Sequence, residues 1–198
     1  MIALIDYGAG NLTSVKKALA ALGAVVFVPA IPEELARARG VIVPGVGHFG
    51  ATRTLDSRWT DAILDRVGNG SPLLGICLGM QWLFEGSDEA PECRGLGLLG
   101  GRCYRLGRAS TVKVPHVGWN SLSVERAQSC VEGVQPGAQV YFTHSYVAPI
   151  TPDTVAVTDH GEAFAAIVQR GHVTGVQFHP EKSGDVGLQV LRNFLEST

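Results

Sequence analysis

The chain has 198 residues, of which 45% are hydrophobic and 17% are charged, and its formal net charge is −2. This length suits one domain whose core is large enough to need no disulfide or metal. Basic and acidic residues nearly balance and the basic ones do not cluster, which argues against a nucleic-acid-binding surface. No apolar stretch approaches the roughly 18 residues of a membrane-spanning helix. The N-terminus lacks the basic segment of a signal peptide, so we expect a cytoplasmic protein.

The first half of the chain alternates short apolar runs with amphipathic segments. The apolar runs predict strands at 2–5, 24–28, 40–43 and 73–76. The other segments predict helices at 12–22, 33–38, 59–67 and 78–85, the first of them capped by Asn11 or Thr13 and ended by Gly23. Strands that alternate with helices in this way form a parallel sheet that is covered on both faces.

After about residue 100 the pattern changes to strands joined by short turns. Strands are predicted at 102–106, 111–114, 121–124, 140–143, 154–158, 163–170 and 173–178, with a two-residue hairpin turn at Gly171-His172 and a last helix at 186–195. We therefore predict one α/β domain over residues 1–198. Its central sheet is mostly parallel with helices on both faces, and its C-terminal half is rich in antiparallel strands.

The strongest local signal is the segment Gly75-Ile76-Cys77-Leu78-Gly79. It places a cysteine between an apolar strand and a helix, with a glycine two residues before and two residues after it. Such glycines remove Cβ atoms that would collide in the sharp turn of a nucleophile elbow. The start of a helix also favours a thiolate and lowers the thiol pKa from its usual value of about 8.5. We predict that Cys77 is a nucleophile, whereas Cys93, Cys103 and Cys130 lack this context and are expected to be unreactive free thiols.

A histidine that could serve this nucleophile lies in the segment Val176-Gln177-Phe178-His179-Pro180-Glu181. A thiol nucleophile needs a general base and acid, and the imidazole needs a partner that orients it. Pro180 favours an extended conformation at His179, and residues two apart in an extended segment point the same way. We therefore expect Glu181 to lie beside His179 and to fix its tautomer.

A third segment, Pro44-Gly45-Val46-Gly47, follows another predicted strand. Two glycines beside a catalytic elbow can turn backbone N–H groups toward a developing oxyanion. We assign this oxyanion hole to Val46 and Gly47, with the N–H of Leu78, the residue after the nucleophile, as the other donor.

Taken in this order, 75–81 and 179–181 resemble the signature segments of the class I glutamine amidotransferases, which use a Cys-His-Glu triad on a three-layer fold. Four further segments, 6–12, 44–49, 115–120 and 141–146, are similar to one branch of that family. Members of this branch are glutaminase subunits that work in histidine biosynthesis with a (β/α)8 barrel synthase subunit. The resemblance extends over residues 2 to about 195.

The resemblance implies a role for each matching residue. Cys77 attacks the carboxamide of L-glutamine, and His179, oriented by Glu181, moves the protons while a γ-glutamyl thioester forms and is hydrolysed. No cofactor and no metal are implied. The substrate is held by Gln81, Glu89, Ser145, Tyr146 and the backbone at Gly45 and Gly47. Ammonia passes to the barrel subunit, which makes imidazole glycerol phosphate and AICAR, and the heterodimer interface involves Asn11, Trp119, Tyr141 and Lys182.

Several alternatives remain open at this stage. Another amidotransferase subunit, for anthranilate, aminodeoxychorismate or pyridoxal phosphate synthesis, is disfavoured by Met80, the segment 118–120 and the run 77–81. A cysteine hydrolase or peptidase, or a binding module without turnover, would share the fold.

From the residues alone, Trp119 and Tyr141 could equally be core aromatics. The chemistry does not need His116 or His144, which are expected to be structural. Flexible Gly45 and Gly47, together with the resemblance, suggest that the oxyanion hole forms only when the partner carries its ligand.

Overall fold

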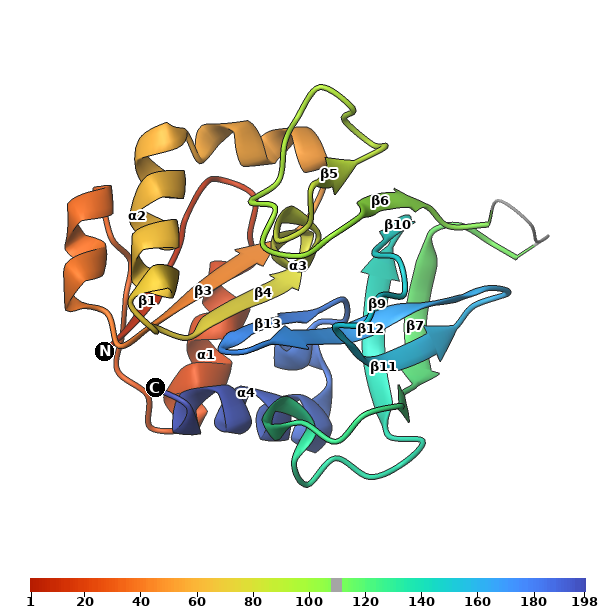
Figure 1. The fold of residues 1–198 in the computed structure, drawn as a ribbon. Coiled ribbons are helices and arrows are strands. Elements are labelled where there is room, and N and C mark those ends of the chain that lie inside the picture. The colour runs from red at the N-terminus through yellow and green to blue at the C-terminus, as the bar shows by residue number, and fades with distance from the viewer. Residues whose placement is uncertain (108–111) are drawn as a thin grey trace.

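A computed structural model describes residues 1–107 and 112–198. Its largest sheet has eight strands (Figure 1). In spatial order they are β2 (Val26–Phe27), β1 (Ile2–Leu4), β3 (Gly40–Gly45), β4 (Leu73–Cys77), β13 (Val173–Val176), β12 (Ala163–Arg170), β11 (Thr154–Asp159) and β8 (Ser123–Val124). The strands from β2 to β13 are parallel, and β12, β11 and β8 continue the sheet in antiparallel pairs. The predicted α/β architecture is confirmed.

Helices cover both faces of the parallel half because successive strand side chains point to opposite faces. On one face Leu4, Ile42 and Leu74 pack against α1 (Leu12–Ala21) and α4 (Gly184–Glu196). On the other face Ala3, Val43 and Leu73 share a core with α2 (Ser57–Gly68), the 3-10 helix η1 (Pro32–Arg37) and the short helix α3 (Leu78–Trp82). Figure 1 shows α2 above the sheet and α4 below it.

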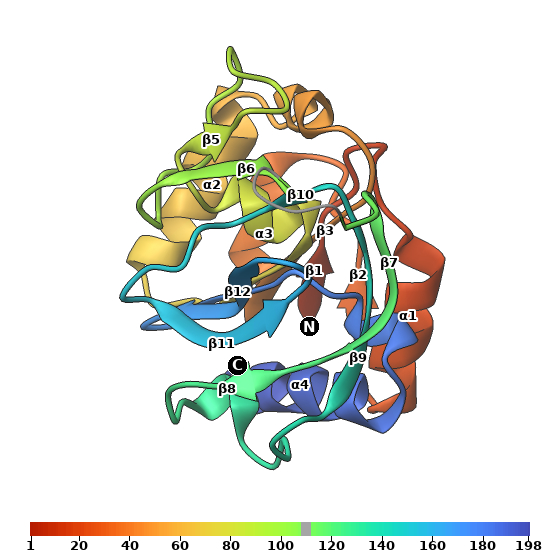
Figure 2. The same cartoon turned by 90° about the vertical axis from the view of Figure 1, so that its right-hand side faces the viewer.

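Two smaller sheets stand at the end of the large sheet where its parallel strands finish. One pairs β7 (His116–Ser121) with β9 (Gln139–His144), and Figure 2 shows this long ribbon beside the main sheet. The other contains β10 (Tyr146–Val147), β6 (Arg102–Arg105) and β5 (Gly86–Ser87). Three further 3-10 helices are η2 (Phe49–Thr54), η3 (Ser129–Val131) and η4 (Pro180–Lys182). The two small sheets bring segments 86–106 and 116–147 over the ends of β3, β4 and β13.

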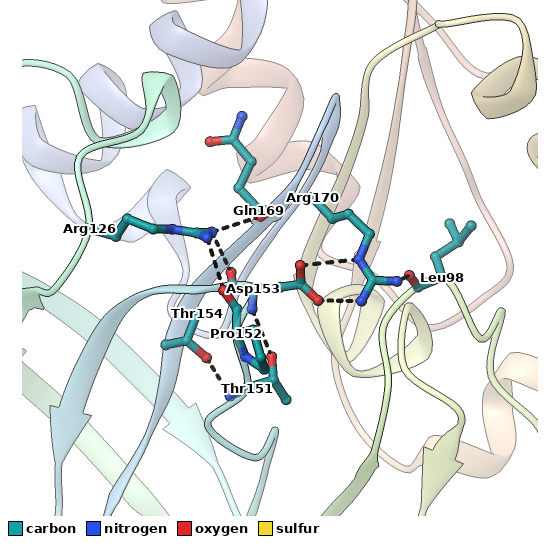
Figure 3. A network of polar contacts seen from close by, with 8 residues as sticks. All are labelled: Leu98, Arg126, Thr151, Pro152, Asp153, Thr154, Gln169 and Arg170. Carbon is teal, nitrogen blue, oxygen red and sulfur yellow. Dashed lines mark hydrogen bonds and ion pairs between the residues drawn. The ribbon is translucent and has the colours of Figure 1, made fainter.

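A polar network fastens the antiparallel half of the sheet to the loop at Leu98 (Figure 3). The Arg126 guanidinium donates to the carbonyl oxygens of Pro152, Asp153 and Gln169 at 2.9, 3.3 and 3.1 Å. Arg170 forms two hydrogen bonds of 3.1 and 2.5 Å with the Asp153 carboxylate and a third, of 2.8 Å, with the Leu98 carbonyl. Bidentate arginine–carboxylate pairs have a defined geometry, so the start of β11 and the end of β12 are held together.

The structure corrects several predicted elements. The helix expected at 33–38 is the 3-10 helix η1, and the strands expected at 24–28 and 173–178 are shortened to β2 and β13. The helix expected at 78–85 ends at Trp82, because the backbone of Glu85 instead bonds with Gly101 and Gly95. Of the strand expected at 111–114, Thr111 lies outside the described residues, and the following strand begins only at His116, after Pro115. The strand expected at 121–124 is divided between β7 and β8. The strand 163–170 and the hairpin turn after it are as predicted.

Among the described residues, no helix combines the length and the apolar character that crossing a membrane requires.

Candidate active site

Cys77 occupies a strained turn between β4 and α3. It ends the strand and precedes the helix with φ 53° and ψ −107°, and no other non-glycine residue among those described has a positive φ. A non-glycine residue at such an angle costs free energy, and this kind of strain is found at functional sites. The side chain is only 5% exposed, and the Gln177 Nε2 lies 3.6 Å from its sulfur.

The two glycines of the elbow allow α3 to approach the sheet closely. A Cβ on Gly79 would lie 1.8 Å from the Val43 carbonyl oxygen, and a Cβ on Gly75 would lie 2.6 Å from the Gly79 oxygen. Both contacts are with backbone atoms, which cannot turn aside as a flexible side chain can. The glycines therefore set the distance between α3, β3 and β4, and with it the position of Cys77.

His179 and Glu181 form a buried pair directly after β13. The His179 Nδ1 lies 2.8 Å from the Glu181 Oε1, and each side chain is only 1% exposed. Burial by itself lowers the pKa of His179, but the adjacent Cys77 and Glu181 outweigh this effect and raise it above its ordinary value. A hydrogen bond of 2.9 Å from the His179 backbone N–H to the Tyr141 carbonyl fixes the segment against β9. The imidazole is thus oriented by a carboxylate at Nδ1, and its buried Nε2 has no hydrogen-bond partner among the described residues.

A pocket of about 330 Å³ lies beside Cys77. Of the residues predicted for catalysis and substrate binding, those that line it are Gly47, Cys77, Leu78, Gln81, Glu89, Ser145 and Tyr146. The Glu89 carboxylate accepts a hydrogen bond of 2.7 Å from the Phe49 backbone N–H. The sequence-predicted residues Gly45 and Val46 are not among the lining residues. Gly45 is paired with Cys77 in the sheet and packs against Tyr7 and Leu78.

Gln81 is held in one orientation at the floor of this pocket. Its Nε2 donates to the Tyr146 carbonyl oxygen at 2.8 Å and to the Gln177 Oε1 at 3.2 Å. With Nε2 committed to two acceptors, Oε1 is the end of the amide that can accept a hydrogen bond from a bound molecule. The pocket therefore combines the nucleophile and a fixed amide, whereas the predicted catalytic residues His179 and Glu181 are not among its lining residues.

The segment after β3 directs one of the two predicted oxyanion donors away from the pocket. The Val46 N–H donates to the Ala9 carbonyl oxygen at 2.8 Å. The Val46 N–H is thus directed toward the β1–α1 loop and not toward the pocket. The next residue, Gly47, has a φ of 95° and does line the pocket.

The predicted interface residues lie on one side of the molecule, next to the triad. Trp119 on β7 is 56% exposed, and its ring meets the Tyr141 ring on β9 edge-on with 6.0 Å between centroids. The Lys182 Nζ lies 5.7 Å from the centroid of the Tyr141 ring. Asn11 caps α1 by accepting a hydrogen bond from the Ser14 N–H, and α1 contacts η4. Val117, also exposed on β7, was missed, because no strand was predicted over residues 116–120 and its outward direction could not be inferred.

The chain matches known proteins over nearly its whole length. The family model "Glutamine amidotransferase class-I" matches residues 3–198. The chain belongs to this family. It is 48% identical over 197 residues to the imidazole glycerol phosphate synthase subunit HisH of a Bacillus cereus strain, an alignment that covers 98% of this chain and 93% of that protein. The protein of the same name from Bacillus anthracis is 46% identical with the same coverage.

Solved structures agree with this membership. A crystal structure of a glutamine amidotransferase superposes with a TM-score of 0.78 at 25% identity, over 100% of this chain and 98% of the other. The structure of PurLQS from Thermotoga maritima has a TM-score of 0.77 at 19% identity, over 98% and 97% of the two chains, and supports the fold alone.

Three residues of this amidotransferase pocket were not predicted. Pro115, Thr143 and His144 line it together with the predicted residues. They come from the start of β7 and the end of β9, which are distant in sequence from Cys77 and His179. The strand pairing of Val117 with Thr143 brings them together. A histidine at a strand end next to predicted substrate-binding residues was the available signal for His144.

We expect Gly79→Ala to destabilise this amidotransferase by more than about 2 kcal/mol, because the new methyl group meets the Val43 carbonyl and α3 must move away from the sheet. Urea unfolding measures the effect. The matched control is Gly68→Ala in α2, where an added Cβ meets no other atom within 4 Å and alanine favours helix. Equal stability of the two variants would show that the elbow tolerates a side chain.

We expect the free energy of unfolding to fall as the pH is lowered from about 6.5 to 4. Burial, reinforced by neighbouring histidines, lowers the pKa of His116 to about 4 and of His144 to about 3. An unfolded imidazole has a pKa of about 6.5, so in this range the unfolded chain binds protons that the folded chain does not. The pKa of His179 is raised, so the folded chain binds this proton more tightly than the unfolded chain does. The stability that His179 contributes is therefore fully present below about pH 6.5 and is lost only as the pH rises above about 6.5.

Urea unfolding at a series of pH values measures this dependence. Each excess proton gives a slope of about 1.4 kcal/mol per pH unit. The variant His116→Asn removes one of the two groups and is expected to flatten the slope. An unchanged slope in this variant would contradict the assignment of His116 as a buried neutral imidazole.

Proposed function

We propose that the chain is the glutaminase subunit of imidazole glycerol phosphate synthase and acts in histidine biosynthesis. The observation that carries this proposal is the strained Cys77 elbow, which lines a pocket and has the buried His179–Glu181 pair as its neighbour. The identity of 48% to a relative of that name over 98% of the chain supports the same conclusion. We infer one glutaminase domain over residues 1–198, located in the cytoplasm, with no cofactor and no metal.

The reaction begins when His179 takes the proton of the Cys77 thiol and the sulfur attacks the side-chain carbonyl carbon of L-glutamine. The tetrahedral intermediate collapses to a γ-glutamyl thioester as the C–N bond breaks, and His179 returns the proton to the leaving ammonia. A water molecule, deprotonated by the same imidazole, then attacks the thioester. The sulfur leaves and takes up the proton, so one glutamine and one water give one glutamate and one ammonia.

The lining residues supply the polar groups that glutamine requires. We assign the Gln81 Oε1 as an acceptor for a substrate N–H group, because its Nε2 is committed to Tyr146 and Gln177. The Glu89 carboxylate complements the α-amino group of the substrate. The backbone of Ser145 and Tyr146 forms the opposite wall, and Gly47 lines the pocket beside Cys77.

The oxyanion hole requires two backbone donors, which we assign to Leu78 and to Val46 or Gly47. The Leu78 N–H follows the nucleophile directly, as in other elbows. The Val46 N–H, in contrast, donates to the Ala9 oxygen, so its peptide must rotate before it can stabilise an oxyanion. Flanking glycines lower the cost of such a rotation. We infer that the free chain is nearly inactive and that a liganded partner induces this rotation.

The partner is a (β/α)8 barrel subunit, to which the released ammonia passes for the synthesis of imidazole glycerol phosphate and AICAR. We place its docking face at Trp119, Tyr141, Lys182 and Asn11. An exposed tryptophan whose ring meets a tyrosine ring edge-on, next to a lysine, supports this placement, because tryptophan and tyrosine are enriched in interface hot spots. This face adjoins His179, because the His179 backbone N–H donates to the Tyr141 carbonyl oxygen, so ammonia is released close to the proposed docking face.

The first test is the release of glutamate from glutamine by this chain, alone and mixed with the barrel subunit, with and without the nucleotide ligand of that subunit. We expect turnover only in the liganded mixture, and its loss in Cys77→Ser. The matched control is Cys130→Ser, because Cys130 is buried in the core and its pKa is raised by burial, to about 12. Equal turnover in every mixture would support the glutaminase activity but contradict its dependence on the liganded partner. No turnover in any mixture would contradict the proposed function.

We also expect Trp119→Ala to weaken the binding of the barrel subunit by about 10-fold to 100-fold, since a central aromatic hot spot contributes roughly 2 kcal/mol. Isothermal titration calorimetry measures the affinity. The control is Val25→Ala, which shortens another exposed apolar side chain at the opposite end of the parallel strands. Equal affinities for the two variants would place the interface elsewhere.

A further inference from the structure

Three imidazole rings lie in contact where the β7–β9 ribbon meets the turn after β11. The His116 ring lies parallel to the His160 ring with 4.1 Å between centroids. It meets the His144 ring edge-on, and the His116 Nδ1 lies 3.1 Å from the His144 Nε2. His144 lines the pocket that contains Cys77, whereas His116 lies farther from it on β7. The proposed chemistry uses none of the three.

The tautomers of the two inner rings follow from their partners. The His144 Nδ1 lies 3.2 Å from the Tyr146 carbonyl oxygen. A carbonyl can only accept, so Nδ1 carries the proton and Nε2 of the neutral ring is an acceptor. The His116 Nδ1 must therefore donate to it, which leaves the His116 Nε2 as an acceptor as well.

Asn120 determines the other end of this chain of hydrogen bonds. Its Nδ2 lies 3.3 Å from the His116 Nε2 and donates to the Asp159 carbonyl oxygen at 2.8 Å. Its Oδ1 accepts from the Ser121 N–H at 2.8 Å. The two backbone contacts fix the direction of the amide, so a donor always faces His116. Burial and the neighbouring rings lower the pKa of both inner histidines, which keeps them neutral near pH 7.

The series of hydrogen bonds that begins at Asn120 ends at a group that we assign to substrate binding. The Tyr146 carbonyl that accepts from His144 also accepts from the Gln81 Nε2 at 2.8 Å. This carbonyl thereby orients the Gln81 amide and holds the Ser145–Tyr146 wall of the pocket. Where this series of hydrogen bonds begins, β7 exposes Trp119 on one face and directs His116 inward on the other. One strand thus carries both the predicted docking residue and the start of the polar chain.

We propose that His116 and Asn120 are positioning residues for the glutamine site: by fixing the tautomer of His144 they hold the Tyr146 carbonyl, and they couple the position of β7 to the affinity for glutamine. This inference rests on the proposed function, since it assumes that glutamine occupies the pocket beside Cys77. A shift of β7 on partner docking reaches the substrate through Asn120, His116 and His144, without moving Cys77 or His179.

The kinetic test compares three variants in the liganded complex with the barrel subunit. In His116→Leu the donor to His144 is lost, and we expect KM for glutamine to rise about 10-fold while kcat stays within about twofold. In His116→Asn the amide nitrogen can replace Nδ1 as the donor, and we expect KM to recover most of the way to that of the unsubstituted chain. His160→Leu is the matched control, because it removes a ring of the same stack that makes no hydrogen bond to His144 or Asn120, and its KM should not change.

A spectroscopic test is independent of turnover. The ¹⁵N chemical shifts of the imidazole nitrogens in the free chain should identify His116 and His144 as Nδ1–H tautomers. In Asn120→Asp an acceptor replaces the donor, and we expect His116 to change to the Nε2–H tautomer. An Nε2–H tautomer of His144 in the unsubstituted chain would overturn the proposal.

The outcomes separate this proposal from the function on which it rests. If the unsubstituted complex turns over glutamine but KM is the same in His116→Leu, the positioning role is wrong and the glutaminase stands. If His116→Asn and His116→Leu raise KM equally, His116 contributes packing only, and the proposal is again wrong. An absence of glutaminase activity in the unsubstituted complex would contradict the proposed function itself.

Discussion

The structure depends above all on the close contact between α3 and the two strands beneath it. A helix that starts directly at the end of a strand must turn within one residue, and that residue is Cys77, with its positive φ. The turn is accessible only because Gly75 and Gly79 carry no Cβ where the backbone of Val43 and Gly79 lies. The packing of α3, Val43 and the strand neighbours offsets the cost of the strained angle. Strain in the nucleophile is thus a consequence of how tightly the layers pack.

The order of the strands in the sheet then decides what meets this cysteine. β13 lies beside β4 in parallel register, with Val176 opposite Ile76, so Gln177 is level with Cys77 and His179 follows just beyond the strand. The chain continues past the carboxyl ends of the parallel strands, where α/β proteins form their binding sites. The antiparallel extension, fastened by Arg126 and Arg170, supports the β7–β9 ribbon that closes the pocket from the other side.

Several polar groups inside this arrangement are held by partners that fix their direction, whereas the buried His179 Nε2 has no hydrogen-bond partner among the described residues. Glu181 orients His179, the Tyr146 carbonyl orients both Gln81 and His144, and backbone groups orient Asn120. In a buried site an amide or an imidazole that faced the wrong way would leave a polar atom without a partner, which costs about 1–3 kcal/mol. The glutaminase site is therefore organised by hydrogen-bond direction as much as by shape.

The sequence by itself determined the elements and residues whose signals are local. Alternating apolar runs predicted the parallel strands, and the spacing of glycines around Cys77 and of Glu181 after His179 predicted the elbow and the oriented imidazole. These signals are readable because the backbone angles and side-chain directions involved are set within a few residues. Only the tertiary structure decided the rest: that α3 ends at Trp82, that the Val46 N–H faces Ala9, and that Pro115, Thr143 and His144 join the pocket. Each of these depends on a hydrogen bond or strand pairing between segments distant in the chain. Such contacts produce no hydrophobic periodicity in either segment, so the sequence does not reveal them.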